Sequence, residues 1–423
     1  MPPINKLKQS RKKCPFVMFS AFVVWFVLMK MSIVHLGPEH PAIRDILNLT
    51  SESQRQQSPD YFPLVETQQA RAETTHPRNK QSNPSQEHSS TIKPRVWRSW
   101  PSHAPLPCFE PDAEMFTEAV QTTQSRIGFL YVRPLKTGSS SMNGAVIRAA
   151  QLIANRENRS FDICKLRVFH GFASRYGYVQ REKEQSFLYS SLRDPSQRSV
   201  SRFFFAQVSR RKVQPTDQNF INFLKATSRS SYLTTLSMLP YQDTPEQYQR
   251  DVGKVLEDYD FIAITERMDE SLIVMQMLLG LQPMDMLYFS VKTNGGYDDG
   301  GADTGCTFIQ KSQLTDGMTE YLRSDDWKAR TRSDYMLYEA AKISLDLTIE
   351  HLGRDKFNKN LREFRKALAV VKSACEGLVK FPCALDGTRN NDTDCIWEDS
   401  GCGQKCLNEV STEFKNDTTT NQR

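Results

Sequence analysis

The sequence predicts an α/β fold in which a parallel sheet is covered by helices. Three short β-rich runs, 126–135, 186–192 and 259–265, are each followed by a segment with helical spacing. This alternation favours parallel strands joined by helical crossovers. Ligands of parallel sheets bind beyond the carboxyl ends of the strands, so the residues just after these runs are the first candidates for a functional site.

The helices after the first two strands have recognisable beginnings. The run RIGFLYVRPL leads into SSSMNGAVIRAAQLIAN, which has helical spacing. The run SFLYSSL opens a helix expected over 195–211. Asp194 is suited to the N-cap of that helix, and Pro195 to its first turn.

The remaining helices complete the predicted domain. YDFIAIT precedes an apolar helix over 269–281, which Pro283 ends. Two long helical patterns follow, over 333–352 and 355–372. Gly353 is expected to be the C-cap between them.

A membrane anchor is expected near the N-terminus. An apolar run over 15–36, interrupted by Lys30 and His35, is long enough for one span. Positive charge in 1–14 and its scarcity after the run predict a cytosolic tail and a lumenal remainder. A cleavable signal peptide is the alternative, although no clean cleavage site follows. Either topology argues against a nucleic-acid partner, and the formal charge of +6 says little about one.

Beyond the span, composition divides the chain into three parts. Residues 37–107 are rich in Ser, Gln, Pro, Thr and charge, which predicts a flexible, disordered stem. The folded domain is expected over 108–374. A cysteine-rich C-terminal tail is expected over 375–423.

The cysteines indicate an oxidising compartment. Eight of the nine lie beyond the span, an even number that predicts disulfides without fixing their connectivity. A zinc module is the alternative for the five from Cys375 onward, but no histidine accompanies them and their spacing is irregular. Four glycosylation sequons also fall on the lumenal side, at Asn48, Asn158, Asn391 and Asn416.

A phosphate-binding loop is predicted between the first strand and its helix. Gly138 allows close approach of a ligand, and the helix N-terminus offers unpaired N–H groups and the positive end of a dipole. Lys136 adds a full charge. The order differs from the G-x-x-x-x-G-K-[ST] loop of nucleotide hydrolases. An ordinary turn with capping serines is the alternative interpretation.

A second anion site is predicted after the second strand. Arg193 stands at the end of that strand, and Ser201 lies about two helical turns further on, so both can face one crevice. A guanidinium and a hydroxyl together suit a phosphate. A surface arginine beside a helix cap is the alternative.

The two motifs together resemble those of a known family. PLKTGSSS followed by SLRDPSQRSVSRFFF resembles the two signatures of Golgi carbohydrate sulfotransferases, which bind 3′-phosphoadenosine 5′-phosphosulfate. Residues 259–294 are similar to galactose 3-O-sulfotransferases, whereas FHGFASRYGY with RDPSQRSVS is more similar to uronyl and heparan sulfate 2-O-sulfotransferases. The resemblance covers 126–375. It implies a P-loop-like sulfotransferase fold in a single-pass type II protein of the Golgi membrane with a lumenal catalytic domain.

The resemblance also implies roles for the two loops in a metal-independent sulfonate transfer to a glycan. Lys136 would neutralise charge on the oxygen that links sulfur to the leaving phosphate. Arg193 and Ser201 would hold the 3′ phosphate. Lys292 and Thr293 would add cofactor contacts, although the following GGYDDGGADTG departs from the expected pattern. The 5′ phosphate would be held by Lys136, Thr137, Gly138, Ser139, Ser140 and Ser141.

Transfer to a hydroxyl also needs a base for the acceptor proton. Only His170 and His351 lie in the predicted domain, and His351 is expected to be an exposed residue near a helix end. His170 matches the family's catalytic histidine, although Phe172 replaces the second histidine of the H-G-H pattern. Asp162 or Glu266 is the fallback base.

Two other function classes stay open. A metal-dependent Golgi glycosyltransferase would share the anchor, stem and disulfides; its candidate metal ligands are Asp298, Asp299 and Asp303, although a solvated glycine-rich loop explains them as well. A noncatalytic glycan-binding membrane protein would use basic side chains such as Arg202, Arg210, Arg211 and Lys212. The acceptor sugar and the oligomeric state cannot be predicted from these patterns.

Overall fold

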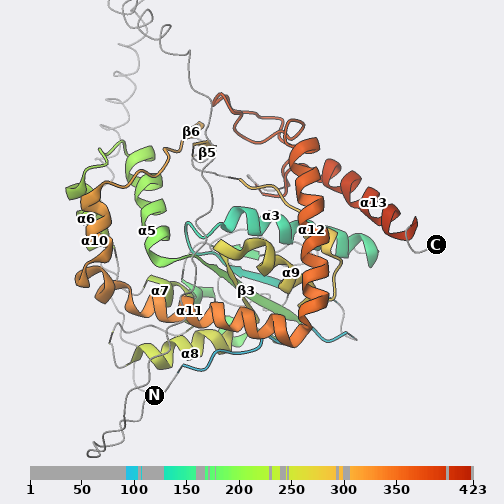
Figure 1. The fold of residues 1–423 in the computed structure, drawn as a ribbon, viewed down its shortest axis with the longest axis horizontal. Coiled ribbons are helices and arrows are strands. Elements are labelled where there is room, and N and C mark those ends of the chain that lie inside the picture. Colours follow the sequence, from blue (N-terminus) through green and yellow to red (C-terminus); the bar gives the residue numbers. More distant parts are fainter. Residues whose placement is uncertain are drawn as a thin grey trace, which may run out of the picture. The chain divides into compact units, whose positions relative to one another are not determined.

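Figure 1 shows a computed structural model of the chain. The structure describes residues 92–102, 106, 128–158, 167–169, 172–176, 178–227, 231–238, 244, 247–291, 295–298, 305–396 and 400–420. All of them belong to one compact unit, which spans Gln86–Arg423. The predicted membrane span, 15–36, lies outside the described residues. Among the helices that the structure describes, none is long and apolar enough to cross a membrane.

A parallel sheet of four strands lies at the centre of the unit, which confirms the predicted α/β class. The strand order is β2-β1-β3-β4. Every residue of β1, β3 and β4 is buried, as expected for a parallel sheet covered on both faces. Three strands match the predicted runs, and the second is new; the bounds are β1 Gly128–Val132, β2 Arg167–Phe169, β3 Ser186–Leu192 and β4 Phe261–Ile264.

The strand order creates a switch point between β1 and β3. The chain passes from β1 to β2 on one side and then crosses to β3 on the other side of β1. In doubly wound sheets, ligands bind outside the carboxyl ends of the strands at such a point. The turns that follow β1 and β3 are the ones predicted above to bind anions.

Helices follow the strands closely. Helix α3 (Ser139–Arg156) follows β1, and α5 (Pro195–Phe203) follows β3. The side chain of Asp194 accepts a hydrogen bond from the N–H of Gln197 at 2.8 Å, which confirms the predicted N-cap. The predicted helix over 195–211 changes type midway, because its second half is the π-helix η5 (Phe204–Arg210).

The later helices extend further than predicted. Helix α11 (Asp325–Leu352) begins eight residues before the expected start at 333, and α12 spans Arg354–Cys375. Gly353, with φ of 95°, separates them as predicted. The other elements are η3 (Ala173–Tyr176), η4 (Tyr178–Gln180), α6 (Asp217–Ala226), α7 (Ser231–Leu236), α8 (Tyr248–Asp258), η7 (Thr265–Arg267), α9 (Met268–Leu278), η8 (Pro283–Met286), β5 (Tyr297–Asp298), β6 (Thr307–Phe308), α10 (Asp316–Arg323) and α13 (Gln404–Thr420).

The folded unit begins earlier than the sequence suggests. Trp97 is 0% exposed, and its backbone N–H donates to the hydroxyl of Thr348 at 2.9 Å. The backbone N–H of Trp100 donates to the carbonyl of Leu278 at 2.7 Å. Residues 92–102 therefore pack on the domain, and the expected stem boundary at 107 is wrong for this segment. The stem was predicted because its apolar residues do not recur at a regular spacing, and a single buried tryptophan does not produce such a spacing.

The C-terminal segment is likewise part of the unit. Disulfides join Cys306 to Cys383, Cys375 to Cys406 and Cys395 to Cys402, which confirms the predicted pairing in this region. Arg148 on α3 is 1% exposed and donates to the side chains of Gln404 and Asn408 on α13, at 3.1 and 2.6 Å. The last 49 residues (375–423) thus include a helix that packs on α3. Cys108 and Cys164 lie outside the described residues.

Candidate functional site

The turn between β1 and α3 has a backbone that few residues adopt. Gly138 is left-handed, with φ of 66°, and directly precedes α3. A Cβ at this position would lie 3.0 Å from Met268 Cε and 3.1 Å from Thr265 Cγ2, so both conformation and space favour glycine. Lys136 also has a positive φ, 65°. Such backbone strain at a residue other than glycine concentrates at functional sites.

A buried arginine lies behind this turn. Arg133 is 4% exposed and donates from Nε to Ser139 Oγ at 2.9 Å and from Nη2 to Ser140 Oγ at 2.7 Å. Each serine hydroxyl therefore accepts from the guanidinium and keeps its own proton to donate. Sequence reasoning missed Arg133, although its place directly after β1 is the signal that could have found it. Ser141 accepts from the N–H of Val291 at 3.3 Å.

The turn after β3 presents a second cation. Arg193 is half-buried, and its guanidinium makes no hydrogen bond or ion pair with another described residue. Its backbone N–H and carbonyl are both held by the hydroxyl of Tyr232, at 2.8 and 2.7 Å. Ser201 lies on α5 and is 5% exposed. An arginine side chain on a fixed backbone is suited to binding an anion.

Hydrogen bonds join the turns at the sheet edge. The hydroxyl of Thr137 lies 2.9 Å from that of Ser191 on β3. Arg198 on α5 donates from Nε to the carbonyl of Leu135 at 2.9 Å. The hydroxyl of Thr265, after β4, donates to the carbonyl of Thr137 at 2.7 Å. The structure thus brings the turn of Lys136 and the turn of Arg193 together, as their positions after neighbouring strands predicted.

The π-helix places an aromatic ring beside Lys136. The Nζ atom of Lys136 lies 3.9 Å from the ring centroid of Phe205, and Arg210 Cζ lies 4.3 Å from the same centroid. The cations gain electrostatically from the ring face. π-helical segments are rare and frequent at functional sites. The α-helical pattern assumed over 195–211 did not reveal this contact.

The acidic glycine-rich loop has a structural role at Asp298. Its carboxylate, 1% exposed, forms an ion pair with Arg210. Within the part of the chain that the structure describes, no cluster of three or more His, Cys, Asp or Glu side chains could hold a metal ion. Asp299 and Asp303 lie outside that part.

Several predicted site residues lie outside the described residues. They are the candidate bases His170 and Asp162, and the predicted cofactor contacts Lys292 and Thr293. Glu266 is exposed, and both of its carboxylate oxygens accept hydrogen bonds, from the N–H of Asp194 at 2.9 Å and from the hydroxyl of Tyr338 at 3.0 Å. Glu266 therefore braces the second turn from β4.

The other basic side chains of α5 and η5 have individual environments. Arg202 lies over the ring of Phe223 at 5.9 Å, and burial lowers the pKa of Arg202. Arg211 and Lys212 are exposed at the end of η5. Since Arg210 is paired with Asp298, these four cations do not form a single free patch.

Neither a family model nor a curated protein matches the chain. The chemistry of the site is therefore inferred from its own residues. At the switch point an ammonium, a guanidinium, several hydroxyls and the N-terminus of an 18-residue helix gather on two joined turns. This arrangement suits a ligand with two anionic groups.

Proposed function

We propose that the chain is a carbohydrate O-sulfotransferase that transfers a sulfonate from 3′-phosphoadenosine 5′-phosphosulfate to a sugar hydroxyl. The main support is that hydrogen bonds join the Lys136 turn to both elements that flank Arg193: to β3 between Thr137 and Ser191, and to α5 between Leu135 and Arg198. The donor carries one phosphate on the 3′ oxygen and another on the 5′ oxygen of its ribose. Two adjacent turns, each with its own cation, fit such a ligand.

The first turn binds the reactive end of the donor. The N-terminus of α3 and its hydroxyls hold the 5′ phosphate, since helix N–H groups and their dipole stabilise an anion. Lys136 moves from the ring of Phe205 to the oxygen between sulfur and phosphorus, where negative charge develops as the S–O bond breaks. Arg133 holds Ser139 and Ser140 in place for this contact.

The second turn binds the other end, and the acceptor attacks in line. Arg193 and Ser201 hold the 3′ phosphate. The sugar hydroxyl oxygen attacks sulfur while His170 takes its proton, and 3′-phosphoadenosine 5′-phosphate leaves. The acceptor is a glycan, with a uronic acid 2-hydroxyl or a galactose 3-hydroxyl as the position to test first. Disulfides at the C-terminus are in keeping with a Golgi lumenal location on a type II membrane anchor.

The experiment is a transfer assay with the full-length chain. The donor, labelled in its sulfonate, is incubated with a panel of glycans in the presence of a chelator, and the product is analysed for linkage. We expect the wild-type chain to transfer the sulfonate to a sugar hydroxyl. The His170→Ala variant should lose this transfer but still bind 3′-phosphoadenosine 5′-phosphate. Arg323→Ala, which removes an exposed arginine on α10, is the matched control and should transfer normally. Activity that requires manganese and a nucleotide sugar would favour a glycosyltransferase instead.

A further inference from the structure

We propose that Tyr232 is a positioning residue for the donor's 3′ phosphate, because its hydroxyl fixes the backbone of Arg193 and thereby aims the guanidinium. This inference rests on the proposed function and deepens it. Tyr232 is 0% exposed. It lies on α7, 39 positions from Arg193 in the sequence, and neither predicted phosphate motif includes it.

The backbone of Arg193 needs a partner that the sheet does not provide. The pairing of β3 with β1 ends at Ser190, and its pairing with β4 ends at Leu192. Arg193 is thus one residue past the last strand pair. The hydroxyl of Tyr232 accepts from the N–H of Arg193 at 2.8 Å and donates to its carbonyl at 2.7 Å. Burial raises the pKa of Tyr232, so the hydroxyl keeps the proton that it donates.

The ring of Tyr232 connects the second turn with the first. The guanidinium carbon of Arg198 lies 4.3 Å from the ring centroid of Tyr232. Arg198 is 6% exposed, and its Nε donates to the carbonyl of Leu135, next to Lys136. Its Nη1 donates to Ser231 Oγ at 3.1 Å. One tyrosine therefore holds the turn of Arg193 by its hydroxyl and supports the Lys136 turn through its ring.

Helix α11 fixes Tyr232 itself. The two carboxylate oxygens of Asp334, 4% exposed, accept from the N–H groups of Ser231 at 3.1 Å and of Tyr232 at 2.8 Å. A buried carboxylate that accepts two backbone N–H bonds is held rigidly, since either lost bond leaves a buried polar group without a partner. Asp334, Tyr232 and Arg193 form a chain from α11 to the second turn.

The test compares two nucleotides on the full-length chain by calorimetric titration. 3′-Phosphoadenosine 5′-phosphate carries both phosphates, whereas adenosine 5′-monophosphate lacks the 3′ phosphate. Tyr232→Phe keeps the ring over Arg198 and removes only the hydroxyl. We expect affinity for the bisphosphate to fall roughly tenfold, equivalent to about 1.4 kcal/mol, with affinity for the monophosphate unchanged.

The outcomes separate this inference from the proposed function. If the wild-type chain prefers the bisphosphate, and Tyr232→Phe either loses affinity equally for both nucleotides or loses none, the positioning role alone is overturned. A wild-type chain that binds neither nucleotide overturns both. The matched control is Tyr259→Phe, which removes another buried hydroxyl, one that donates to the carbonyl of Leu236 at 3.1 Å, and should keep the wild-type preference.

A second variant decides the matter if Tyr232→Phe does not fold. Asp334→Ala removes both carboxylate oxygens, so the N–H groups of Ser231 and Tyr232 both lose this acceptor. We expect a smaller preference for the bisphosphate, because Tyr232 loses part of its anchor. An unchanged preference overturns the positioning role.

Discussion

Gly138 is the single residue on which the shape of the first turn most depends. Replacing it with alanine places a Cβ in a left-handed backbone, which costs about 1–2 kcal/mol, and presses that Cβ against Met268 and Thr265. We expect Gly138→Ala to lower the free energy of unfolding by at least this amount and to weaken binding of the proposed sulfonate donor. Urea unfolding and nucleotide titration measure the two effects.

Gly253 is the matched control for that substitution. It lies inside α8, and a Cβ there would meet nothing within 4 Å. Gly253→Ala should therefore stabilise the chain by about 0.5–1 kcal/mol, because alanine is the better helix residue. If both alanine variants changed stability in the same direction, the special conformation of Gly138 would not be the cause.

At the residue scale, the sequence predicted what lies next to strand ends and missed what depends on contacts between distant segments. Lys136, Gly138 and Arg193 directly follow apolar runs, so local pattern alone located them. Arg133 looked like one more loop residue, since only the fold shows it buried beneath two serines. Tyr232 acts 39 positions away from Arg193, and no local spacing carries that information.

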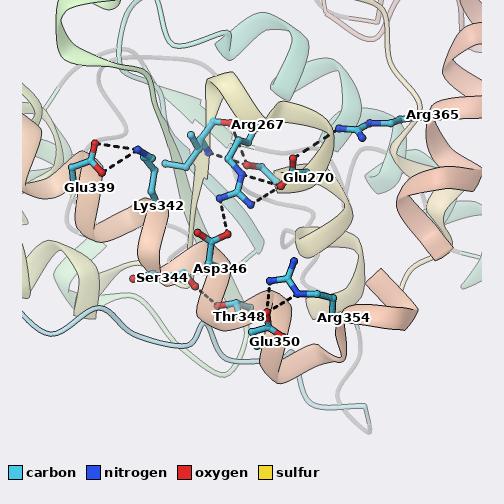
Figure 2. Close-up of polar contacts among 12 residues, drawn as sticks. Arg267, Glu270, Glu339, Lys342, Ser344, Asp346, Thr348, Glu350, Arg354 and Arg365 are labelled. Atoms are coloured by element: carbon cyan, nitrogen blue, oxygen red, sulfur yellow. Dashed lines mark hydrogen bonds and ion pairs between the residues drawn. The ribbon is translucent and has the colours of Figure 1, made fainter. Parts of the chain in front are cut away.

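At the element scale, α11 supports two turns at the carboxyl edge of the sheet: the turn after β4 directly, and the Arg193 turn through α7. Asp334 holds α7, Tyr338 donates to Glu266 after β4, and Asp346 pairs with Arg267 at 2.8 Å. These positions are separated by four and eight residues, so they lie along one side of the helix. Figure 2 shows Arg267 reaching from the β4 turn to both Glu270 and Asp346.

The ion pairs of Arg267 are predicted to contribute more to the free energy of unfolding than the ion pairs within α11. Burial by itself lowers the pKa of Arg267, but hydrogen bonds to the carboxylates of Glu270 and Asp346 outweigh it and raise that pKa. Arg267→Gln should lower the free energy of unfolding by about 1 kcal/mol, since two charge-assisted contacts between elements are lost at a half-buried site.

The control for this prediction is drawn in the same view. Lys342 pairs with Glu339 within α11 at 3.0 Å, with side chains 36% and 53% exposed, so this pair joins two positions of one helix rather than two elements. Lys342→Gln should change stability by less than about 0.5 kcal/mol. If urea unfolding gave the same decrease in the free energy of unfolding for both variants, the ion pair between the β4 turn and α11 would contribute no more than a pair within one helix.

Elements were predictable where one local signal sufficed. The start of α5 follows from Asp194 and Pro195, and Gly353 marks the boundary of two helices. The π-helix η5 could not be predicted, because its wide turn is held by Ser209, which donates to the carbonyl of Phe204 at 2.8 Å and accepts from the N–H of Gln310. Strand β2 is three residues long and too short for alternation to reveal.

At the scale of the whole molecule, both ends of the described unit close the core. Trp97 packs edge-on against Phe261 of β4, with ring centroids 6.1 Å apart. At the other end, Arg148 of α3 is buried against α13, and burial lowers its pKa to about 10. Composition alone assigned these ends to a stem and a tail. The residues that flank Trp97 in the sequence are mostly polar, and an arginine such as Arg148 is ordinarily exposed to solvent.

The smallest folding fragment is therefore predicted to span 86–423 rather than 108–374. Starting at 108 removes Trp97, a loss on the scale of about 3–5 kcal/mol. Ending at 374 deletes Cys375 and α13, whose Leu407 and Val410 belong to the hydrophobic core, and it exposes the surface of α3 around Arg148; the lost apolar packing costs a further ~2–5 kcal/mol. Together these approach the whole stability of a typical domain, about 5–15 kcal/mol.

The test compares four secreted fragments, 86–423, 108–423, 86–374 and 108–374, by near-ultraviolet circular dichroism during heating. Only the first should unfold cooperatively near the midpoint of the full-length chain. A sharp transition for 108–374 within a few degrees of that midpoint would mean that neither end contributes to the core.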